Sequence, residues 1–244
     1  MRRDYVGLWS PAIGAEGGLL AYGHHGRPLL VFQSEQGRCS DYEDRGMIDA
    51  IAGLIEAGRV KVYSVDSYDA ASWCDPNLPL EARAVQHGRF EDWIRNQVVP
   101  FIYDDCQGVL DVMVTGASFG AFHAANALFR RPDLFDAVIA MSGFYDLGPD
   151  YLHGYSDDNA FFNNPAWYLP GLGGDDLHKL QTACKILILT GQGAYEAPDA
   201  SRFLSKILHS KAIPHFLDIW GHDVAHDWPW WLKMLPYAID LMGW

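Results

Sequence analysis

Residues 110–120 read Leu110-Asp111-Val112-Met113-Val114-Thr115-Gly116-Ala117-Ser118-Phe119-Gly120 and carry the most information about the fold. An apolar run with the composition of a buried strand enters the pattern G-x-S-x-G, and a helix-compatible run begins near Phe119. A serine in this setting sits on a sharp, strained turn, which needs small neighbours and exposes the hydroxyl at the carboxyl end of the strand. Gly116 and Gly120 provide that room. We therefore expect a nucleophile at Ser118, and a tight turn without a chemical role is the alternative.

Short apolar runs alternate with helix-compatible runs on both sides of this turn. Residues 185–189 are apolar at nearly every position, which is typical of strands covered by helices on both faces. The alternation predicts an α/β fold in three layers around a mostly parallel sheet, with residues 1–244 forming one domain. The expected strands are 19–22, 29–32, 60–65, 109–115, 137–141, 186–190 and 215–219, and the expected helices are 41–57, 80–103, 119–130, 199–211 and 228–242.

The segment from Gly143 to Asp176 has little clear period. A long irregular segment in a compact domain is more often a binding loop or a lid than a linker. We expect this loop near the active site, where its aromatic residues either form a wall for a small substrate or a hydrophobic cluster that holds the loop down. These residues are Phe144, Tyr145, Tyr151, Tyr155, Phe161, Phe162, Trp167 and Tyr168.

Composition excludes several classes of function. The chain has 18 Lys plus Arg against 31 Asp plus Glu, a formal charge of −13, so neither nucleic acid nor an anionic membrane surface is an expected partner. With 49% apolar residues the chain can form a sizeable core. No apolar run approaches the roughly 18 residues of a membrane span, and none of signal-peptide length follows the first arginines. Four scattered cysteines without C-x-x-C pairing favour a cytoplasmic location.

Two histidines are candidates for the base that a serine nucleophile requires. In sites of this strand-turn-helix type the acid and then the histidine follow the serine along the chain. His222 and His226 both come after the expected strand 215–219. His226 directly precedes a helix start that contains Pro229, which predicts a loop tip able to fold over the edge of the sheet. We favour His226, and His222 is the alternative.

Three carboxylates are candidates for the acid, the group that accepts a hydrogen bond from the Nδ1–H of this histidine and so fixes its tautomer. Glu196 follows the expected strand 186–190 and is the preferred acid. Asp199 immediately precedes a helix-compatible run, so an N-cap is its expected role. Asp146, which follows the strand ending at Met141, ranks third.

An acyl-transfer site also needs two N–H donors for the oxyanion that develops on the substrate. One is the N–H of Phe119, directly after the nucleophile, and the other is expected from the loop after an early strand. The loop after strand 29–32 has that position, and Gly37 within it allows close approach, so the donor is expected between Gln36 and Arg38. A flexible surface loop without this role is the alternative.

At these residues the chain resembles the serine esterase family of α/β-hydrolases, which includes esterase D, feruloyl esterases and mycolyltransferases. The resemblance covers most of the chain from Leu29 onward, and it implies the α/β-hydrolase fold and ester hydrolysis rather than any particular ester. It also implies Ser118 as the nucleophile, His226 in a His-Asp-Trp-Pro setting as the base, and Glu196 at the acid position, where many relatives carry aspartate. The segments that carry the resemblance are 116–124, 131–135, 141–146 and 226–231.

Three other interpretations stay open. Residues 222–226 read His-Asp-Val-Ala-His, the spacing of a zinc-binding H-E-x-x-H helix with aspartate for glutamate, which would indicate metal-assisted hydrolysis. Gly221 and Pro229 around the pair favour a loop instead. The second is an inactive hydrolase-fold protein that binds a ligand, and the third is acyl transfer to an alcohol.

The preferred hypothesis is a serine carboxylic-ester hydrolase that acts on a small-molecule ester through an acyl-enzyme. No cofactor or metal is expected, and the sequence leaves a homo-oligomer open.

Overall fold

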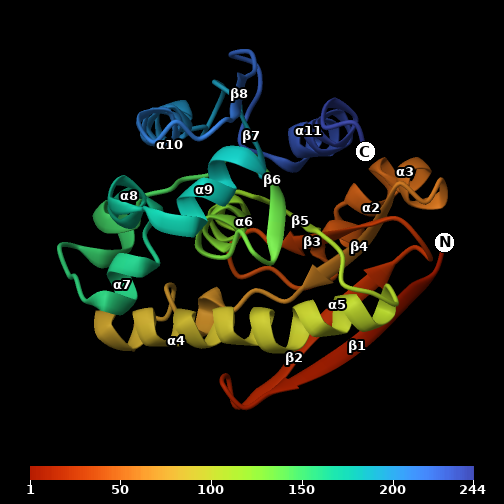
Figure 1. Cartoon of the computed structure of the whole chain (residues 1–244), viewed down its shortest axis with the longest axis horizontal. Coiled ribbons are helices and arrows are strands. Elements are labelled where there is room, and N and C mark those ends of the chain that lie inside the picture. The colour runs from red at the N-terminus through yellow and green to blue at the C-terminus, as the bar shows by residue number, and fades with distance from the viewer.

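The computed structural model describes all residues 1–244. Eight strands form one sheet with the order β1-β2-β4-β3-β5-β6-β7-β8 (Figure 1). The strands β1 and β2 are antiparallel to their neighbours, whereas all pairs from β4 to β8 are parallel. The strands are β1 Arg3–Ser10, β2 Ala15–Tyr22, β3 Arg27–Phe32, β4 Val60–Val65, β5 Val112–Ala117, β6 Phe135–Met141, β7 Lys185–Thr190 and β8 Phe216–Ile219.

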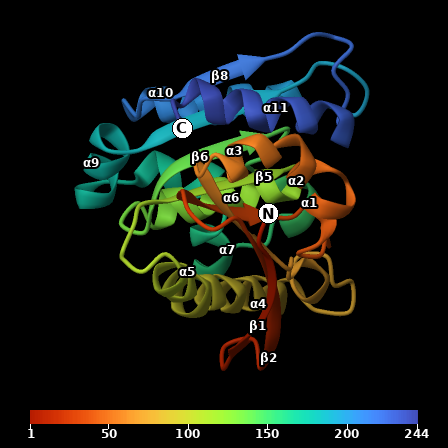
Figure 2. The same cartoon turned by 90° about the vertical axis from the view of Figure 1, so that its right-hand side faces the viewer.

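Helices cover both faces of the sheet. On one face α1, α2, α3 and α11 pack against the strands in one apolar cluster, and this side is turned to the viewer in Figure 2. On the other face α4, α5, α6, α9 and α10 contribute to a second cluster. The helices are α1 Asp41–Asp44, α2 Met47–Ala50, α3 Ala52–Glu56, α4 Leu80–Trp93, α5 Val99–Asp105, α6 Phe119–Arg130, α7 Asp158–Phe162, α8 Pro165–Tyr168, α9 Gly174–Thr182, α10 Pro198–Ser210 and α11 Trp228–Leu241. The prediction of a three-layer α/β fold is confirmed.

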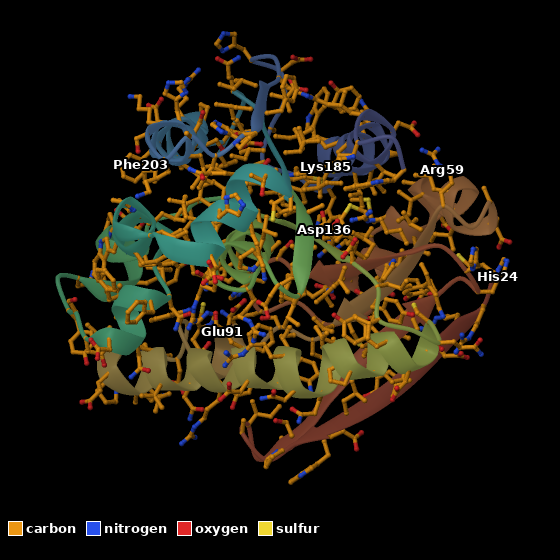
Figure 3. The ribbon with its side chains drawn as sticks, viewed as in Figure 1. His24, Arg59, Glu91, Asp136, Lys185 and Phe203 are labelled. Atoms are coloured by element: carbon orange, nitrogen blue, oxygen red, sulfur yellow. The ribbon has the colours of Figure 1, made fainter.

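Helix α4 is held against α6 by a polar contact as well as by apolar packing. Glu91 lies on the side of α4 that faces α6 (Figure 3), and its Oε1 accepts a hydrogen bond from Asn126 Nδ2 at 2.9 Å. Arg130, at the end of α6, pairs with the other oxygen of the same carboxylate. This contact fixes the long α4 helix beneath the helix that begins at the strained serine.

The observed elements depart from the expected ones in two places. Strand β1 was not expected, because its side chains are only partly buried and it contains no continuous apolar run; it pairs with β2 along its whole length. The expected helix 41–57 is three short helices, and Gly46 between the first two has a φ of +82°, a conformation that ends an α-helix. The other expected helices occur within a few residues of their expected bounds, although 80–103 contains a π-helical turn at Ile94–Val98.

The segment from Gly143 to Asp176 folds into short helical turns instead of an open loop. Four of its aromatic residues pack in one cluster with Phe119 and Phe122 at the start of α6, and these are Phe144, Tyr151, Tyr155 and Trp167. The ring centroid of Phe119 lies 5.0 Å from that of Phe144 and 5.2 Å from that of Tyr151. The segment is therefore held down by an aromatic cluster that includes the residue after Ser118.

None of the helices is long and apolar enough to cross a membrane. All four cysteines are free thiols.

Candidate active site

Ser118 lies at the carboxyl end of β5, between β5 and the first residue of α6. Its φ of 58° and ψ of −120° are a strained conformation for a residue with a side chain. The N–H of Ser118 donates to the Met141 carbonyl at 2.9 Å, which ties the turn to the end of β6. β5 lies between β3 and β6, so the turn lies among the carboxyl ends of the parallel strands. The hydroxyl is therefore presented at the edge where ligands bind in open α/β sheets.

The two glycines of the motif are required by close backbone contacts. A Cβ at Gly116 would lie 2.2 Å from the Gly120 carbonyl carbon, and a Cβ at Gly120 would lie 2.3 Å from the Phe32 carbonyl oxygen. These contacts hold the first turn of α6 directly against β5 and against the end of β3. The loop that follows β3 is thereby fixed next to the serine.

Replacing Gly120 by alanine is expected to destabilise the protein by about 3 kcal/mol, because two backbone segments must move apart to admit one methyl group. Gly53, on α3, has no atom within 4 Å of the position of a Cβ, so Gly53→Ala is the matched control. Urea unfolding of both variants measures the difference. A Gly120→Ala variant as stable as Gly53→Ala would contradict the close packing described here.

His226 lies in the loop between β8 and α11, and its Nε2 is 2.9 Å from Ser118 Oγ. Backbone hydrogen bonds join this loop to the loop after β7: the Gly193 N–H donates to the Val224 carbonyl at 2.8 Å, and the His226 N–H donates to the Ala194 carbonyl at 2.9 Å. The side chain is 25% exposed. The structure thus brings together two residues 108 positions apart in sequence, with the imidazole nitrogen in reach of the hydroxyl proton.

Glu196 lies on the other side of the imidazole. Its Oε2 is 3.6 Å from His226 Nδ1, and its side chain is 1% exposed. The hydroxyl of Ser142 donates to Oε1 at 2.6 Å, and the hydroxyl of Thr190 donates to Oε2 at 3.1 Å. Trp231 Nε1, on α11, donates to Ser142 Oγ at 3.0 Å. This hydrogen bond orients the Ser142 hydroxyl toward the Glu196 carboxylate.

The electrostatic environment keeps this carboxylate ionised. Burial raises the pKa of Glu196, but the adjacent His226 ring and the Ser142 hydroxyl lower that pKa by more, and the net pKa lies below its ordinary value. An ionised Glu196 beside Nδ1 favours the tautomer of His226 that carries its proton on Nδ1. Nε2 is then free to accept a proton from Ser118.

Two of the three N–H groups among which the second donor was expected, Gln36 to Arg38, are hydrogen-bonded within the protein. The Gly37 N–H donates to the Ser34 carbonyl at 2.9 Å, and the Gln36 N–H donates to Asp69 Oδ2 at 3.1 Å. Both are used within the protein, so the expectation for Gly37 does not fit this conformation. The N–H groups of Ser34, Glu35 and Arg38 have no acceptor in the protein.

The alternative residues have other surroundings. His222 lies in a turn, is exposed, and has no hydrogen-bond partner, so His222 and His226 do not share a helix as a zinc motif would require. Asp199 lies in the first turn of α10, 94% exposed, and pairs with Arg202; the N-cap position is taken by Ala197, so the expected N-cap role was wrong. Asp146 Oδ1 accepts from the Gly148 N–H and from Asn164 Nδ2, which gives it a place in the fold of the aromatic segment.

Sequence reasoning missed the hydroxyls of Ser142 and Thr190 and the buried carboxylate of Asp69. A signal existed for the first two, because Ser142 directly follows β6 and Thr190 ends β7, the two strands that come next after β5 in the sheet. Ser142 also has a φ of 52°, which only the structure reveals.

Comparisons with known proteins show the family to which the chain belongs. A family model described as "Putative esterase" matches residues 32–240. No curated protein sequence matches the chain.

Solved structures with a similar fold include three serine hydrolases or esterases. A ferulic acid esterase has a TM-score of 0.75 at 16% identity, with 98% of this chain and 97% of that chain covered. The S-formylglutathione hydrolase of Staphylococcus aureus has a TM-score of 0.69 at 14% identity, with 99% and 98% covered. The fluorophosphonate-binding serine hydrolase F of the same organism has a TM-score of 0.68 at 14% identity, with 99% of each chain covered. At these identities the likeness shows the fold, and the family match adds the chemistry. The chain belongs to the esterase family of serine hydrolases with the α/β-hydrolase fold.

Proposed function

We propose that the protein hydrolyses a small-molecule carboxylic ester through an acyl-enzyme on Ser118, with His226 as the base and Glu196 as the acid. The observation that carries this proposal is the 2.9 Å contact between Ser118 Oγ and His226 Nε2, with Glu196 on the opposite side of the ring. A serine hydroxyl needs such a base to become a nucleophile at neutral pH.

In this mechanism His226 takes the Ser118 proton while the hydroxyl oxygen attacks the ester carbonyl carbon. The tetrahedral intermediate collapses, the alcohol leaves with a proton from His226, and the acyl group stays on Ser118. Water then attacks the acyl-enzyme, losing its proton to the same imidazole, and the acid leaves as the hydroxyl is restored. Glu196 stabilises the imidazolium that forms in both steps.

The oxyanion would be held by the N–H of Phe119 and by a second donor on the loop after β3. Phe119 begins α6, and a first-turn N–H has no partner within its own helix. Ser34 and Glu35 are our candidates for the second donor, because their N–H groups are unused and the preceding residues lie against Gly120. This replaces Gly37 in the proposed site.

A panel of 4-nitrophenyl esters from acetate upward tests the reaction and the acyl preference together. We expect a burst of nitrophenol equal to the enzyme concentration where deacylation limits the rate. Adding a competing alcohol distinguishes the second candidate, acyl transfer, since a transferase would release the new ester in place of the free acid. A protein that hydrolyses none of these esters and forms no acyl-enzyme with them would contradict the proposal.

Replacing Glu196 by glutamine is expected to lower kcat by about 10⁴-fold, because the amide favours the wrong tautomer of His226. The matched control is Asp199→Asn, at the neighbouring carboxylate on the exposed side of α10, which should leave kcat unchanged. Steady-state kinetics on a nitrophenyl ester measures both. Equal activities in the two variants would remove Glu196 from the mechanism.

The same Glu196→Gln variant tests the lowered pKa through the stability of the protein. A carboxylate whose folded-state pKa is lowered stabilises the protein above its unfolded-state pKa, near 4.5, and loses that contribution as the pH falls through the folded-state pKa. The stability advantage of wild type over the variant, measured as the difference between their free energies of unfolding, should therefore shrink as the pH falls below 4.5. A difference that stays constant from pH 7 to about pH 3 would show that the carboxylate has no lowered pKa.

A further inference from the structure

Asp69 is a buried carboxylate that joins three segments around the candidate oxyanion site. It lies in the turn after β4 and is 1% exposed. Its Oδ1 is 2.7 Å from His123 Nε2, and its Oδ2 accepts from the Gln36 N–H at 3.1 Å and from the Ser67 hydroxyl at 2.6 Å. With Oδ1 as the acceptor, the Nε2–H of His123 is the donor of this hydrogen bond. One side chain thus links the loop after β3, the turn after β4 and helix α6.

The His123 ring has no polar partner other than Asp69. It lies on α6 with its centroid 4.9 Å from that of Phe119, 5.2 Å from that of Phe122 and 5.3 Å from that of His87. Burial holds the pKa of His87 well below its ordinary value, so this second imidazole is neutral. In such surroundings the hydrogen bond to Asp69 is strong, and its loss leaves Oδ1 of the buried carboxylate without a partner.

Gln36 is held in a conformation that few residues adopt. Its φ is 56°, in the left-handed region, and the only acceptor of its N–H is Asp69. Such a conformation costs free energy and persists when surrounding contacts enforce it. Ser34 and Glu35, with their unused N–H groups, directly precede Gln36, so the bond to Asp69 fixes the direction of that part of the loop.

We propose that the Asp69–His123 pair holds the two donors of the oxyanion site at their working separation, which makes Asp69 a positioning residue. His123 belongs to the helix whose first residue, Phe119, supplies one donor, and Gln36 belongs to the loop that supplies the other. This inference rests on the proposed function. A donor displaced by about 1 Å can cost about 100-fold in rate, so the effect on catalysis should exceed the effect on binding of the substrate.

Asp69→Asn is the sharpest test, since an amide has one acceptor oxygen and one donor nitrogen. Its single oxygen cannot accept from both His123 and Gln36, although its size is unchanged. Its nitrogen can donate to His123 Nε2 only if the ring proton moves to Nδ1, which is buried with no partner in the protein. We expect kcat per titrated active site to fall about 10- to 100-fold, with KM within about 2-fold of wild type. The affinity for an alkyl boronic acid, which forms a tetrahedral adduct with the serine, should fall by the same factor as kcat.

Two further sets of variants separate positioning from general damage. His123→Gln keeps a donor near the position of Nε2 and should recover most of the kcat that His123→Leu loses. Asp105→Asn is the distant control. Asp105 Oδ2 lies 2.7 Å from Nζ of the buried Lys61. Lys61 is near the start of β4, at the opposite edge of the sheet from Ser118. Asp136 and Lys185 mark the same edge near the starts of β6 and β7 in Figure 3. Asp105→Asn should lower stability and leave kcat per titrated site unchanged.

The outcomes distinguish this inference from the proposed function. If Asp69→Asn and His123→Leu lower only the fraction of active protein and keep kcat per titrated site, the pair is structural and the inference is wrong. If Asp69→Asn does not fold, the comparison of His123→Gln with His123→Leu decides, and equal kcat values in the two overturn it. If wild type itself hydrolyses no ester while remaining folded, the proposed function fails, and the inference fails with it.

Discussion

Replacing Ser118 by alanine is expected to lower kcat for a nitrophenyl ester by at least about 10⁴-fold, because no covalent intermediate can then form. The residual rate would come from the oxyanion donors and substrate binding alone. Ser118 has a positive φ of 58°, which strains alanine and serine alike, so the fold should be unchanged. The measurement is steady-state kinetics together with thermal unfolding of both proteins.

Ser142→Ala is an informative comparison, since it removes a buried hydroxyl that contacts Glu196 but not the nucleophile. We expect it to retain far more activity than Ser118→Ala. Hydrolysis by Ser118→Ala within about 10-fold of wild type would place the nucleophile elsewhere.

Replacing His226 by alanine is expected to lower kcat nearly as far as Ser118→Ala, since residues that act as a unit lose their effect together. The reason is the 2.9 Å contact between its Nε2 and Ser118 Oγ. The double variant Ser118→Ala with His226→Ala should be no slower than Ser118→Ala alone. That non-additivity measures whether the two side chains work in one step.

His222→Ala is the matched control for this variant. His222 lies four residues earlier in the same loop, is exposed, and has no partner in the structure. We expect wild-type kcat for it. If His222→Ala falls as far as predicted for His226→Ala while His226→Ala stays active, the assignment of the base is reversed.

The residues found from sequence are those whose roles depend on local patterns. The strand-turn-helix around Ser118 requires glycine at positions 116 and 120, and the pattern G-x-S-x-G is visible in the sequence itself. His226 and Glu196 follow strands whose apolar runs are easy to recognise, so their places at the sheet edge could be predicted.

The residues that were missed depend on contacts between distant segments. Asp69 is 54 residues from His123 and 33 residues from Gln36 in the sequence, and no local sequence pattern around Asp69 predicts either contact. Gly37 was expected as a donor because glycine allows close approach. A turn can use the same N–H for its own hydrogen bond, and here the Gly37 N–H donates to the Ser34 carbonyl. Which amide of a loop stays free is decided by the fold of the whole loop.

The most direct measurement of the central claim is the site and rate of reaction with a fluorophosphonate. The serine displaces fluoride and becomes a phosphonate ester, which adds a known mass that peptide mapping can locate. We predict stoichiometric labelling at Ser118 in wild type and labelling slowed by orders of magnitude in His226→Ala. Labelling at another residue, or unchanged labelling of Ser118 in His226→Ala, would contradict the account.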